Sequence, residues 1–421
     1  MTFRNLWQVT SRENFASAPL DRDRIVDLAV IGAGFTGCSA ALEAARTGAS
    51  VCVLDAQVVG HGGSGRNVGL VNAGLWLPPD AVLAQMQPAA GMRLIEALAV
   101  APARVFDLIA REGIDCEAIR SGTLHLAHSA AGLRDLQDRH RQGAALGAPV
   151  TILDAAATAR RTGSTAFRGA LLDMRAGTIQ PLAYVRGLAR AATTAGAVVH
   201  ENSPVTGLSR EGGTWVLTAK GHTVRSKRLL IATNAYHLGI GPVFQPQFVD
   251  VSYCQYATDP LPDALRQGIL PGGEGCWDTA LVMSSVRMDR AGRFVIGGIG
   301  NGEGPGASVH ASWARRKMAA LFPQLTGQSL LYGWSGQIAM TSDHIPKIVA
   351  FGPDAYACFG YSGRGIGPGT VFGTQSARAL LAGSHDALPV TPVENHAERF
   401  ATARSVWYEA GASLVHAAAA R

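Results

Sequence analysis

The feature that most constrains the fold is a glycine pattern near the N-terminus. Gly32, Gly34 and Gly37 form G-x-G-x-x-G between the apolar run 26–31, which predicts a buried strand, and the segment 35–47, which predicts a helix. In such a turn the first glycine allows a tight bend, the second lets the backbone approach a pyrophosphate, and the third lets helix and strand pack closely. The pattern therefore predicts a β-α-β unit that binds a dinucleotide.

The residues around this turn extend the predicted site. A second apolar run, 51–54, predicts a strand that ends at Asp55, at the spacing expected for a carboxylate that binds ribose hydroxyls. Phe35 and Thr36 complete the turn, where a helix N-terminus offers free N–H groups to phosphates, and Ala56 follows the carboxylate. The motif alone does not separate NAD from FAD.

A second glycine-rich segment, 61–70, follows the second strand of this unit and should therefore lie near the strand ends, where such folds bind ligands. We interpret it as a loop that wraps the pyrophosphate or the flavin edge, with Ser64 and Arg66 as donors. The alternative is an ordinary surface loop with a solvated arginine. The candidate cofactor contacts here are Gly63, Ser64, Arg66, Asn67, Val68, Gly69 and Leu70.

A third glycine-rich segment, 360–367, again lies between a predicted strand and a predicted helix. An NAD dehydrogenase does not need a second such turn, whereas FAD carries its isoalloxazine ring far from its adenine. A helix N-terminus or a cation near that ring stabilises the charge of the reduced flavin. Arg364 suits this role or that of holding a substrate carboxylate, unless it is simply a surface arginine at a turn. The candidate residues are Gly360, Tyr361, Gly363, Arg364 and Gly365.

Composition excludes several classes of protein. The 421 residues favour two domains or one large α/β unit, and 47% hydrophobic with 16% charged residues indicate a folded globular chain. The net charge of +6 comes without a run of Lys or Arg, so we expect no nucleic-acid partner. We expect no metal, because His125 and His128 lack a ligand partner at suitable spacing. Without a signal peptide or transmembrane segment, a cytoplasmic location is expected.

Together, the three glycine-rich segments resemble those of the D-amino-acid oxidase/glycine oxidase superfamily of FAD enzymes. Four further stretches, 61–74, 176–179, 277–278 and 407–411, look closest to the bacterial L-pipecolate oxidases, while the γ-glutamylputrescine oxidoreductases are similar but more distant. The likeness spans nearly the whole chain.

The resemblance implies an α/β fold, with a Rossmann-like FAD-binding domain and a second, mainly antiparallel β-sheet substrate domain that carries helices. The FAD-binding domain is expected to be discontinuous. We expect it to comprise 1–85, 150–235 and 335–421, with 86–149 and 236–334 forming the substrate-binding domain.

The resemblance also implies roles for residues outside the glycine segments. This chain departs from the superfamily's pattern in two places: the superfamily's last glycine turn commonly carries a His where Arg364 stands, and the region just upstream of 341–343, where sarcosine oxidases attach FAD, contains no Cys. FAD is therefore expected to be non-covalent, with Cys358 a buried strand residue. The implied cofactor contacts are Thr233 and Asn234, close to the flavin, and Val205, near the adenine. The implied pocket residues are Tyr253, Tyr256, Arg287 and Trp334.

The predicted reaction is oxidation of the C–N bond of a small secondary or cyclic amino acid, L-pipecolate-like, to an imine by hydride transfer to flavin N5. Arg287 or Arg364 would pair with the substrate carboxylate, and no side-chain base is required. Oxygen or a respiratory electron carrier would reoxidise the flavin. The alternatives are a γ-glutamylated amine or an N-methyl amino acid as substrate and, more remotely, an NAD-dependent dehydrogenase or a non-catalytic nucleotide-sensing module.

Overall fold

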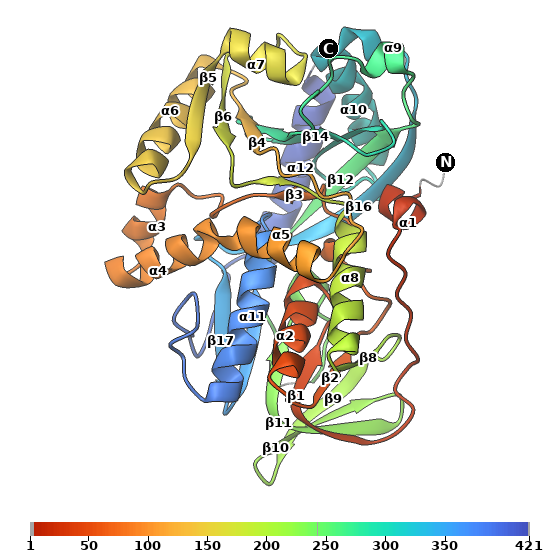
Figure 1. Ribbon diagram of the computed structural model, residues 1–421, viewed down its shortest axis with the longest axis vertical. Coiled ribbons are helices and arrows are strands. Elements are labelled where there is room, and N and C mark those ends of the chain that lie inside the picture. The colour runs from red at the N-terminus through yellow and green to blue at the C-terminus, as the bar shows by residue number, and fades with distance from the viewer. Residues whose placement is uncertain (1–3, 242, 420–421) are drawn as a thin grey trace.

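Two large β-sheets with helices packed against them form the computed structural model, which describes residues 4–241 and 243–419. In the view of Figure 1 one sheet lies in the lower half of the molecule and the other in the upper half. Strands of both sheets come from segments far apart in the sequence, so each sheet is assembled from a discontinuous part of the chain.

The first sheet is built around parallel strands. Its order is β17-β18-β11-β1-β2-β8, with β11, β1, β2, β8 and β18 parallel, β17 antiparallel at one edge, and β10 and β9 added as an antiparallel ribbon on β11. The strand bounds are β1 (Arg24–Ile31), β2 (Val51–Leu54), β8 (Val198–His200), β9 (Val205–Glu211), β10 (Thr214–Ala219), β11 (His222–Ile231), β17 (Lys347–Gly352) and β18 (Ala355–Phe359).

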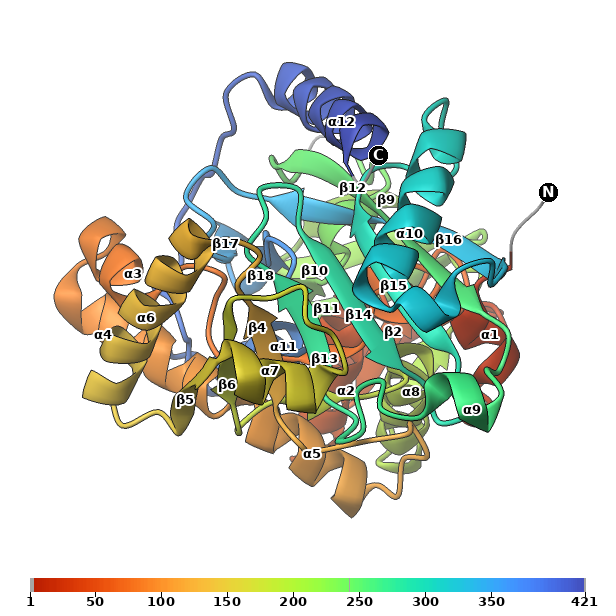
Figure 2. The same ribbon diagram turned by 90° about the horizontal axis from the view of Figure 1, so that it is seen from above.

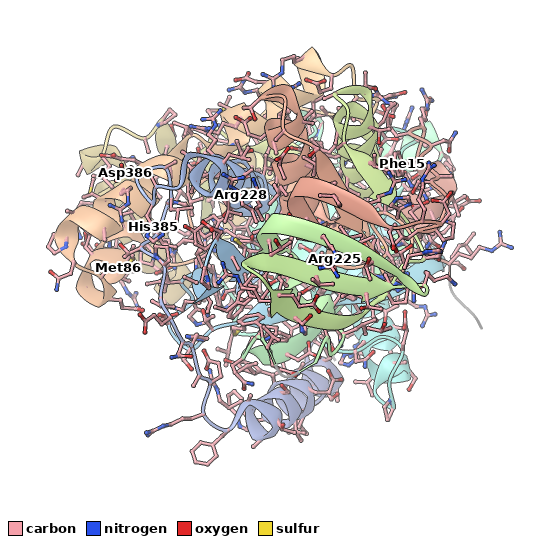
Figure 3. The ribbon with its side chains drawn as sticks, turned by 90° about the horizontal axis from the view of Figure 1, so that it is seen from below. Phe15, Met86, Arg225, Arg228, His385 and Asp386 are labelled. Atoms are coloured by element: carbon pink, nitrogen blue, oxygen red, sulfur yellow. The ribbon has the colours of Figure 1, made fainter. Side chains whose placement is uncertain are left out.

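Three helices cover one face of this sheet and lie side by side in Figure 1: α2 (Phe35–Arg46), α8 (Pro181–Thr194) and α11 (Ile366–Ala382). Their close approach depends on small residues, because a Cβ on Gly373 of α11 would overlap the carbonyl oxygen of Thr36 in α2. At the far end of α11, Arg228 of β11 donates from Nε to the carbonyl of Leu380 at 2.7 Å, and Figure 3 shows this arginine beside the helix. The expected Rossmann-like domain is confirmed.

The second sheet is mainly antiparallel, as expected. Its order is β16-β12-β15-β14-β13-β4-β6-β5, and only the pair β13–β4 is parallel. It has a hydrophobic core of its own, which includes Phe294, Trp313 and Phe322. The bounds are β4 (Thr123–Leu126), β5 (Val150–Asp154), β6 (Gly169–Asp173), β12 (Val249–Thr258), β13 (Gly275–Asp278), β14 (Ser284–Met288), β15 (Phe294–Ile299) and β16 (Leu330–Met340).

The remaining helices lie around the two sheets, and α12 runs along the outer edge of the molecule in Figure 2. None of the helices in the described ranges is long and apolar enough to cross a membrane. Their bounds are α1 (Leu6–Thr10), α3 (Pro79–Gln85), α4 (Pro88–Ala99), α5 (Ala101–Arg111), α6 (Ala130–Ala145), α7 (Ala155–Thr162), α9 (Asp263–Arg266), α10 (Ala307–Leu321) and α12 (Ala401–Ala418). The short elements are β3 (Leu70–Val71), which pairs with β7 (Gly177–Thr178), and the 3-10 turns η1 (Gly63–Gly65), η2 (Asn234–Tyr236) and η3 (Pro323–Leu325).

Two segments differ from what their apolar pattern predicts. Residues 90–111 carry apolar side chains at helical spacing, which predicts one helix, but they form two helices, α4 and α5, with Val100 ending the first and Pro102 in the first turn of the second, where proline is tolerated. The apolar run 281–296 predicts strand structure, and it is divided into β14 and β15 by a turn at Gly292, whose φ of 80° favours glycine.

The domain division remains a proposal, but the sheet to which each strand belongs bears on where its boundaries lie. The expected FAD-binding segment 150–235 begins with β5 and β6, which belong to the second sheet. We therefore place that boundary after β6, since strands paired in one sheet share its core.

Candidate active site

A cavity of about 1020 Å³ lies where the two sheets meet. The carboxyl ends of the parallel strands β1, β2 and β11 open into it at Ile31, Leu54 and Ala232, and the turn after β18 lines it as well. This is the edge at which open parallel sheets bind ligands. The second sheet contributes strands β12, β15 and β16 to the opposite wall, and α12 lies along part of the rim.

The first glycine turn is closed by backbone contacts. Gly32 has a φ of 101°, and a Cβ on Gly37 would overlap the carbonyl oxygen of Gly32, so neither position accommodates a side chain. A Cβ on Gly34 would lie 2.9 Å from Ser64 Oγ, which accepts a hydrogen bond from the Phe35 N–H at 3.0 Å. The turn therefore presents the N-terminus of α2 to the cavity and to the loop 61–70.

Asp55 is fixed at the end of β2 by two backbone donors. Its Oδ2 accepts from Ala33 N at 2.6 Å, and its Oδ1 accepts from Gln57 N at 2.9 Å. Burial raises the pKa of Asp55, while these two donors act in the opposite direction. Asp55 is the one carboxylate among the described residues that line the cavity.

The glycine turn within 360–367, called the second turn below, meets the first turn at 32–37, although the two are more than 300 residues apart. Tyr361 Oη lies 2.8 Å from Thr36 Oγ1 in a buried hydrogen bond. Gly360 donates its N–H to Asn234 Oδ1 at 3.0 Å, so the segment after β11 is joined to the same turn. The structure thus brings together three segments that the sequence only predicted to converge.

Arg364 is the one Arg or Lys among the described residues that line the cavity. Its Nη1 donates to the carbonyl of Ala73 at 2.6 Å, and its guanidinium lies 5.3 Å from the centroid of the Trp277 ring. Burial, followed by the charge of Arg139, lowers the pKa of Arg364 to about 9. The nearby carboxylate of Asp173 is already ion-paired with Arg175 at 2.7 Å. A partly buried, desolvated cation without its own counter-ion favours an anionic ligand.

Strand β12 presents alternate side chains to the cavity. Val251, Tyr253 and Gln255 line it, whereas Tyr256, three residues after Tyr253, lies on the opposite face because side chains of a strand alternate. Of the two tyrosines expected in a substrate pocket, Tyr253 lines this cavity and Tyr256 does not. Tyr253 Oη and Gln255 Oε1 are buried and have no hydrogen-bond partner among the described residues.

Arg287, Trp334 and Arg66 do not line the cavity, in contrast to what we expected. Arg287 is almost fully buried and donates to the carbonyls of Val68 and Ile179, so its guanidinium is not directed at a substrate. Trp334 donates to the Arg66 carbonyl at 2.7 Å. Arg66 itself donates to the Ser335 carbonyl at 3.0 Å. All three thus hold the loop 61–70 on the side away from the cavity: Arg287 and Trp334 by donating to its carbonyls, and Arg66, within the loop, by donating to β16.

The other predicted cofactor contacts divide into those that line the cavity and those that lie outside its lining. Three glycines lie outside the lining and act through backbone geometry: Gly37, Gly69 and Gly360. The remaining ones line the cavity: Gly32, Gly34, Phe35, Thr36, Asp55, Ala56, Gly63, Ser64, Asn67, Val68, Leu70, Val205, Thr233, Asn234, Tyr361, Gly363, Arg364 and Gly365.

Several residues that line the cavity were not predicted as site residues. Gln255 could have been found, because it is two residues from Tyr253 on one strand. Several aromatic and imidazole side chains were also not predicted to line it, although 277–278 and 407–411 contributed to the family resemblance: Trp76, Tyr236, His237, Trp277, His344, Trp407 and Tyr408. None of the six cysteines, all of them buried and described, lines the cavity, and among the described residues no three His, Cys, Asp or Glu side chains could hold a metal ion.

The model of one protein family, FAD dependent oxidoreductase, matches residues 27–379. The chain is 31% identical to γ-glutamylputrescine oxidoreductase of Escherichia coli, with 81% of this chain and 80% of that protein covered. It is 29% identical to the probable oxidoreductase OrdL of Haemophilus influenzae, with 88% and 86% covered. The crystal structure of glycine oxidase from Geobacillus kaustophilus is similar in fold, with a TM-score of 0.73 at 20% identity over 89% of this chain and all of that one.

Proposed function

Because the chain belongs to the FAD-dependent oxidoreductase family, we propose that it oxidises the C–N bond of a small secondary or cyclic amino acid to an imine, L-pipecolate being the model substrate. The observation that carries this proposal is Arg364, a partly buried cation that lines the cavity and has no ion-pair partner among the described residues. An α-amino acid offers the carboxylate that such a cation binds.

The residues present fit FAD. The N-terminus of α2, left open by Gly34, would receive the pyrophosphate, and Asp55, already oriented by two N–H donors, would bind ribose hydroxyls. The N-terminus of α11, at Gly365, would lie at the isoalloxazine end of the cofactor. When bound, FAD supplies the acceptor for the hydride that leaves the substrate carbon.

The chain's own groups would orient the substrate. Arg364 would fix the carboxylate, and the indole of Trp277 beneath its guanidinium restricts where that carboxylate can lie. Tyr253 and Gln255 would offer a hydroxyl and an amide to the substrate amine. With both ends of the amino acid held, one C–H bond is presented in a fixed direction, which is how positioning accelerates a reaction that needs no side-chain base.

The wall around these polar groups is apolar. Val251, Met283, Ile338 and Met340 line the cavity together with the aromatic residues already named. An apolar wall favours the uncharged amine over the ammonium ion, because burial of an unpaired charge is costly. No carboxylate other than Asp55, at the other end, lines the described cavity, so a second ammonium group would lack a partner.

A second candidate substrate is a γ-glutamylated amine. It is favoured by the 31% identity to γ-glutamylputrescine oxidoreductase. Such a substrate also carries a carboxylate that Arg364 could bind, but it places the oxidised C–N bond much farther from that carboxylate. An N-methyl amino acid is a further possibility that no particular residue favours.

Anaerobic reduction of the flavin separates these candidates. The purified protein should show the absorption bands of oxidised flavin, released by acid denaturation because it is not covalently bound. L-pipecolate or L-proline should bleach these bands faster than sarcosine or γ-glutamylputrescine. Rapid bleaching by γ-glutamylputrescine alone would overturn the cyclic amino acid proposal. Reoxidation of the bleached enzyme by air, compared with a quinone, would identify oxygen or a respiratory carrier as the acceptor.

A further inference from the structure

Five successive carbonyl groups of the glycine-rich loop, residues 65–69, each accept a hydrogen bond from a donor outside the loop. Four of the donors are side chains, and the fifth is the backbone N–H of Ile179, which follows β7. They are Asn5 Nδ2 to Gly65 O (3.0 Å), Trp334 Nε1 to Arg66 O (2.7 Å), Trp7 Nε1 to Asn67 O (2.9 Å), Arg287 Nη1 to Val68 O (3.3 Å) and Ile179 N to Gly69 O (2.9 Å).

The four side chains, Asn5, Trp7, Arg287 and Trp334, form one donor cluster. The rings of Trp7 and Trp334 meet edge to face with centroids 5.6 Å apart, and the Arg287 guanidinium lies 5.6 Å from the Trp7 ring centroid. Each of the four is buried, and none lines the cavity. Asn5 also caps α1, since its Oδ1 accepts from Trp7 N at 2.9 Å, so the short helix is itself tied to the cluster.

The opposite side of the same loop forms the cavity wall, through Ser64, Asn67, Val68 and Leu70. The carbonyl and the N–H of a trans peptide point in opposite directions. Donors to the five successive carbonyls of residues 65–69 therefore fix the orientation of those five peptide planes. The bend is sharp enough that a Cβ on Gly69 would overlap the Ile179 carbonyl.

We propose that the donor cluster holds this loop in the conformation that binds FAD, so that Asn5, Trp7, Arg287 and Trp334 are positioning residues for the cofactor. Asn5 and Trp7 lie outside residues 27–379, which match the family model, so the N-terminal segment adds a cofactor-holding function to the family core. This inference rests on FAD as the cofactor and is independent of the substrate.

The test compares tryptophan-to-phenylalanine variants, which keep an aromatic ring but remove the N–H. Trp7→Phe and Trp334→Phe each remove one donor. Trp215→Phe is the matched control, because Trp215 is a buried tryptophan whose Nε1 donates to the Pro353 carbonyl at 3.0 Å, away from the cavity. FAD affinity is measured by quenching of flavin fluorescence on titration into each apoprotein, and the stability of each apoprotein by urea unfolding.

The dissociation constant for FAD should rise roughly 3- to 10-fold in Trp7→Phe and in Trp334→Phe, as expected for loss of one neutral hydrogen bond. Trp215→Phe should lose a similar amount of apoprotein stability with FAD affinity unchanged. Equal FAD affinity in all three variants and the wild type would overturn the inference, as would an equal loss in Trp215→Phe. A wild-type protein that binds no FAD would instead refute the cofactor assignment itself.

Discussion

The two glycine turns that meet in the cavity look alike in sequence and differ in what they do. In the first turn a Cβ on Gly37 would overlap the Gly32 carbonyl, whereas a Cβ on Gly365 in the second turn would meet nothing within 4 Å. The first turn carries no charged side chain, and the second carries Arg364. The first turn is thus crowded where it enters α2, whereas the second, although crowded at Gly360 by Thr341, is uncrowded at Gly365 where it enters α11 and presents a cation.

The largest expected difference between the two turns is in how much a glycine-to-alanine substitution lowers the stability of the fold. Gly37→Ala should lower the free energy of unfolding of the apoprotein by about 3 kcal/mol, because the new methyl group overlaps backbone that cannot move without shifting β1. Gly365→Ala should change it by about 1 kcal/mol or less. Urea unfolding followed by circular dichroism measures both. Equal losses would show that the two turns are equally constrained.

The next effect is on catalysis. Arg364→Met should lower kcat/KM for the amino acid substrate roughly 30- to 1000-fold, which corresponds to an increase of about 2–4 kcal/mol in activation free energy. The reason is that the substrate carboxylate would enter a buried site without a cation. Arg364→Lys should recover part of this loss but not all, since lysine lacks the planar guanidinium that matches a carboxylate. Both variants should keep the flavin absorption spectrum. Loss of FAD from Arg364→Met would place the arginine on the cofactor instead.

A smaller effect is expected on the strand that faces the second turn. Tyr253→Phe should raise KM roughly 3- to 10-fold if its unpaired hydroxyl binds the substrate amine. Tyr256→Phe, on the opposite face of β12, should leave KM unchanged. Steady-state kinetics of the pair tests the assignment, and a higher KM in Tyr256→Phe alone would reverse it.

The effect that is smallest near neutral pH, and that grows on acidification, concerns α12, whose Trp407 and Tyr408 line the cavity. On its inner side His416 lies with Nδ1 2.7 Å from His310 Nδ1, and burial, with the charges of His310, Arg316 and Lys317, lowers the pKa of His416 to about 3. The unfolded chain therefore binds a proton more readily than the folded one. The free energy of unfolding that His416 contributes is at its maximum above the ordinary histidine pKa of about 6.5. It decreases as the pH falls from 6.5 to 3, by up to about 1.4 kcal/mol per pH unit.

His416→Asn should flatten that part of the stability profile, since asparagine can replace the Nδ1 contact and has no proton to gain. Melting temperatures of wild type and variant between pH 7 and 5 give the comparison. Parallel profiles would show that His416 does not contribute to the acid sensitivity.

Local sequence patterns predicted the cavity lining at the first glycine turn better than the lining on the second sheet. Gly32, Gly37 and Asp55 could be identified because their constraint is local: one β-α-β unit fixes turn, helix and strand end. Tyr256 was misplaced although the information was present, because strand alternation separates it from Tyr253.

Other features depended on contacts across the fold. Arg287 was expected to bind substrate, and nothing in its neighbours along the chain shows that it faces the back of a loop more than 200 residues earlier. The same holds for Trp7, whose partner Asn67 is 60 residues away, and for α12, which reaches the cavity from the C-terminal end. The resemblance to a family predicted a Rossmann-like sheet and a mainly antiparallel one, but it did not predict in which direction these side chains point.

The central claim is that the cation of the second turn recognises the substrate carboxylate. The most direct test is a double comparison of the rate of anaerobic flavin reduction, in wild type and Arg364→Met, with L-pipecolate and with piperidine, which lacks the carboxylate. The wild type should prefer L-pipecolate strongly and the variant should lose most of that preference, with little change in its rate on piperidine. An undiminished preference for L-pipecolate in Arg364→Met would contradict the account.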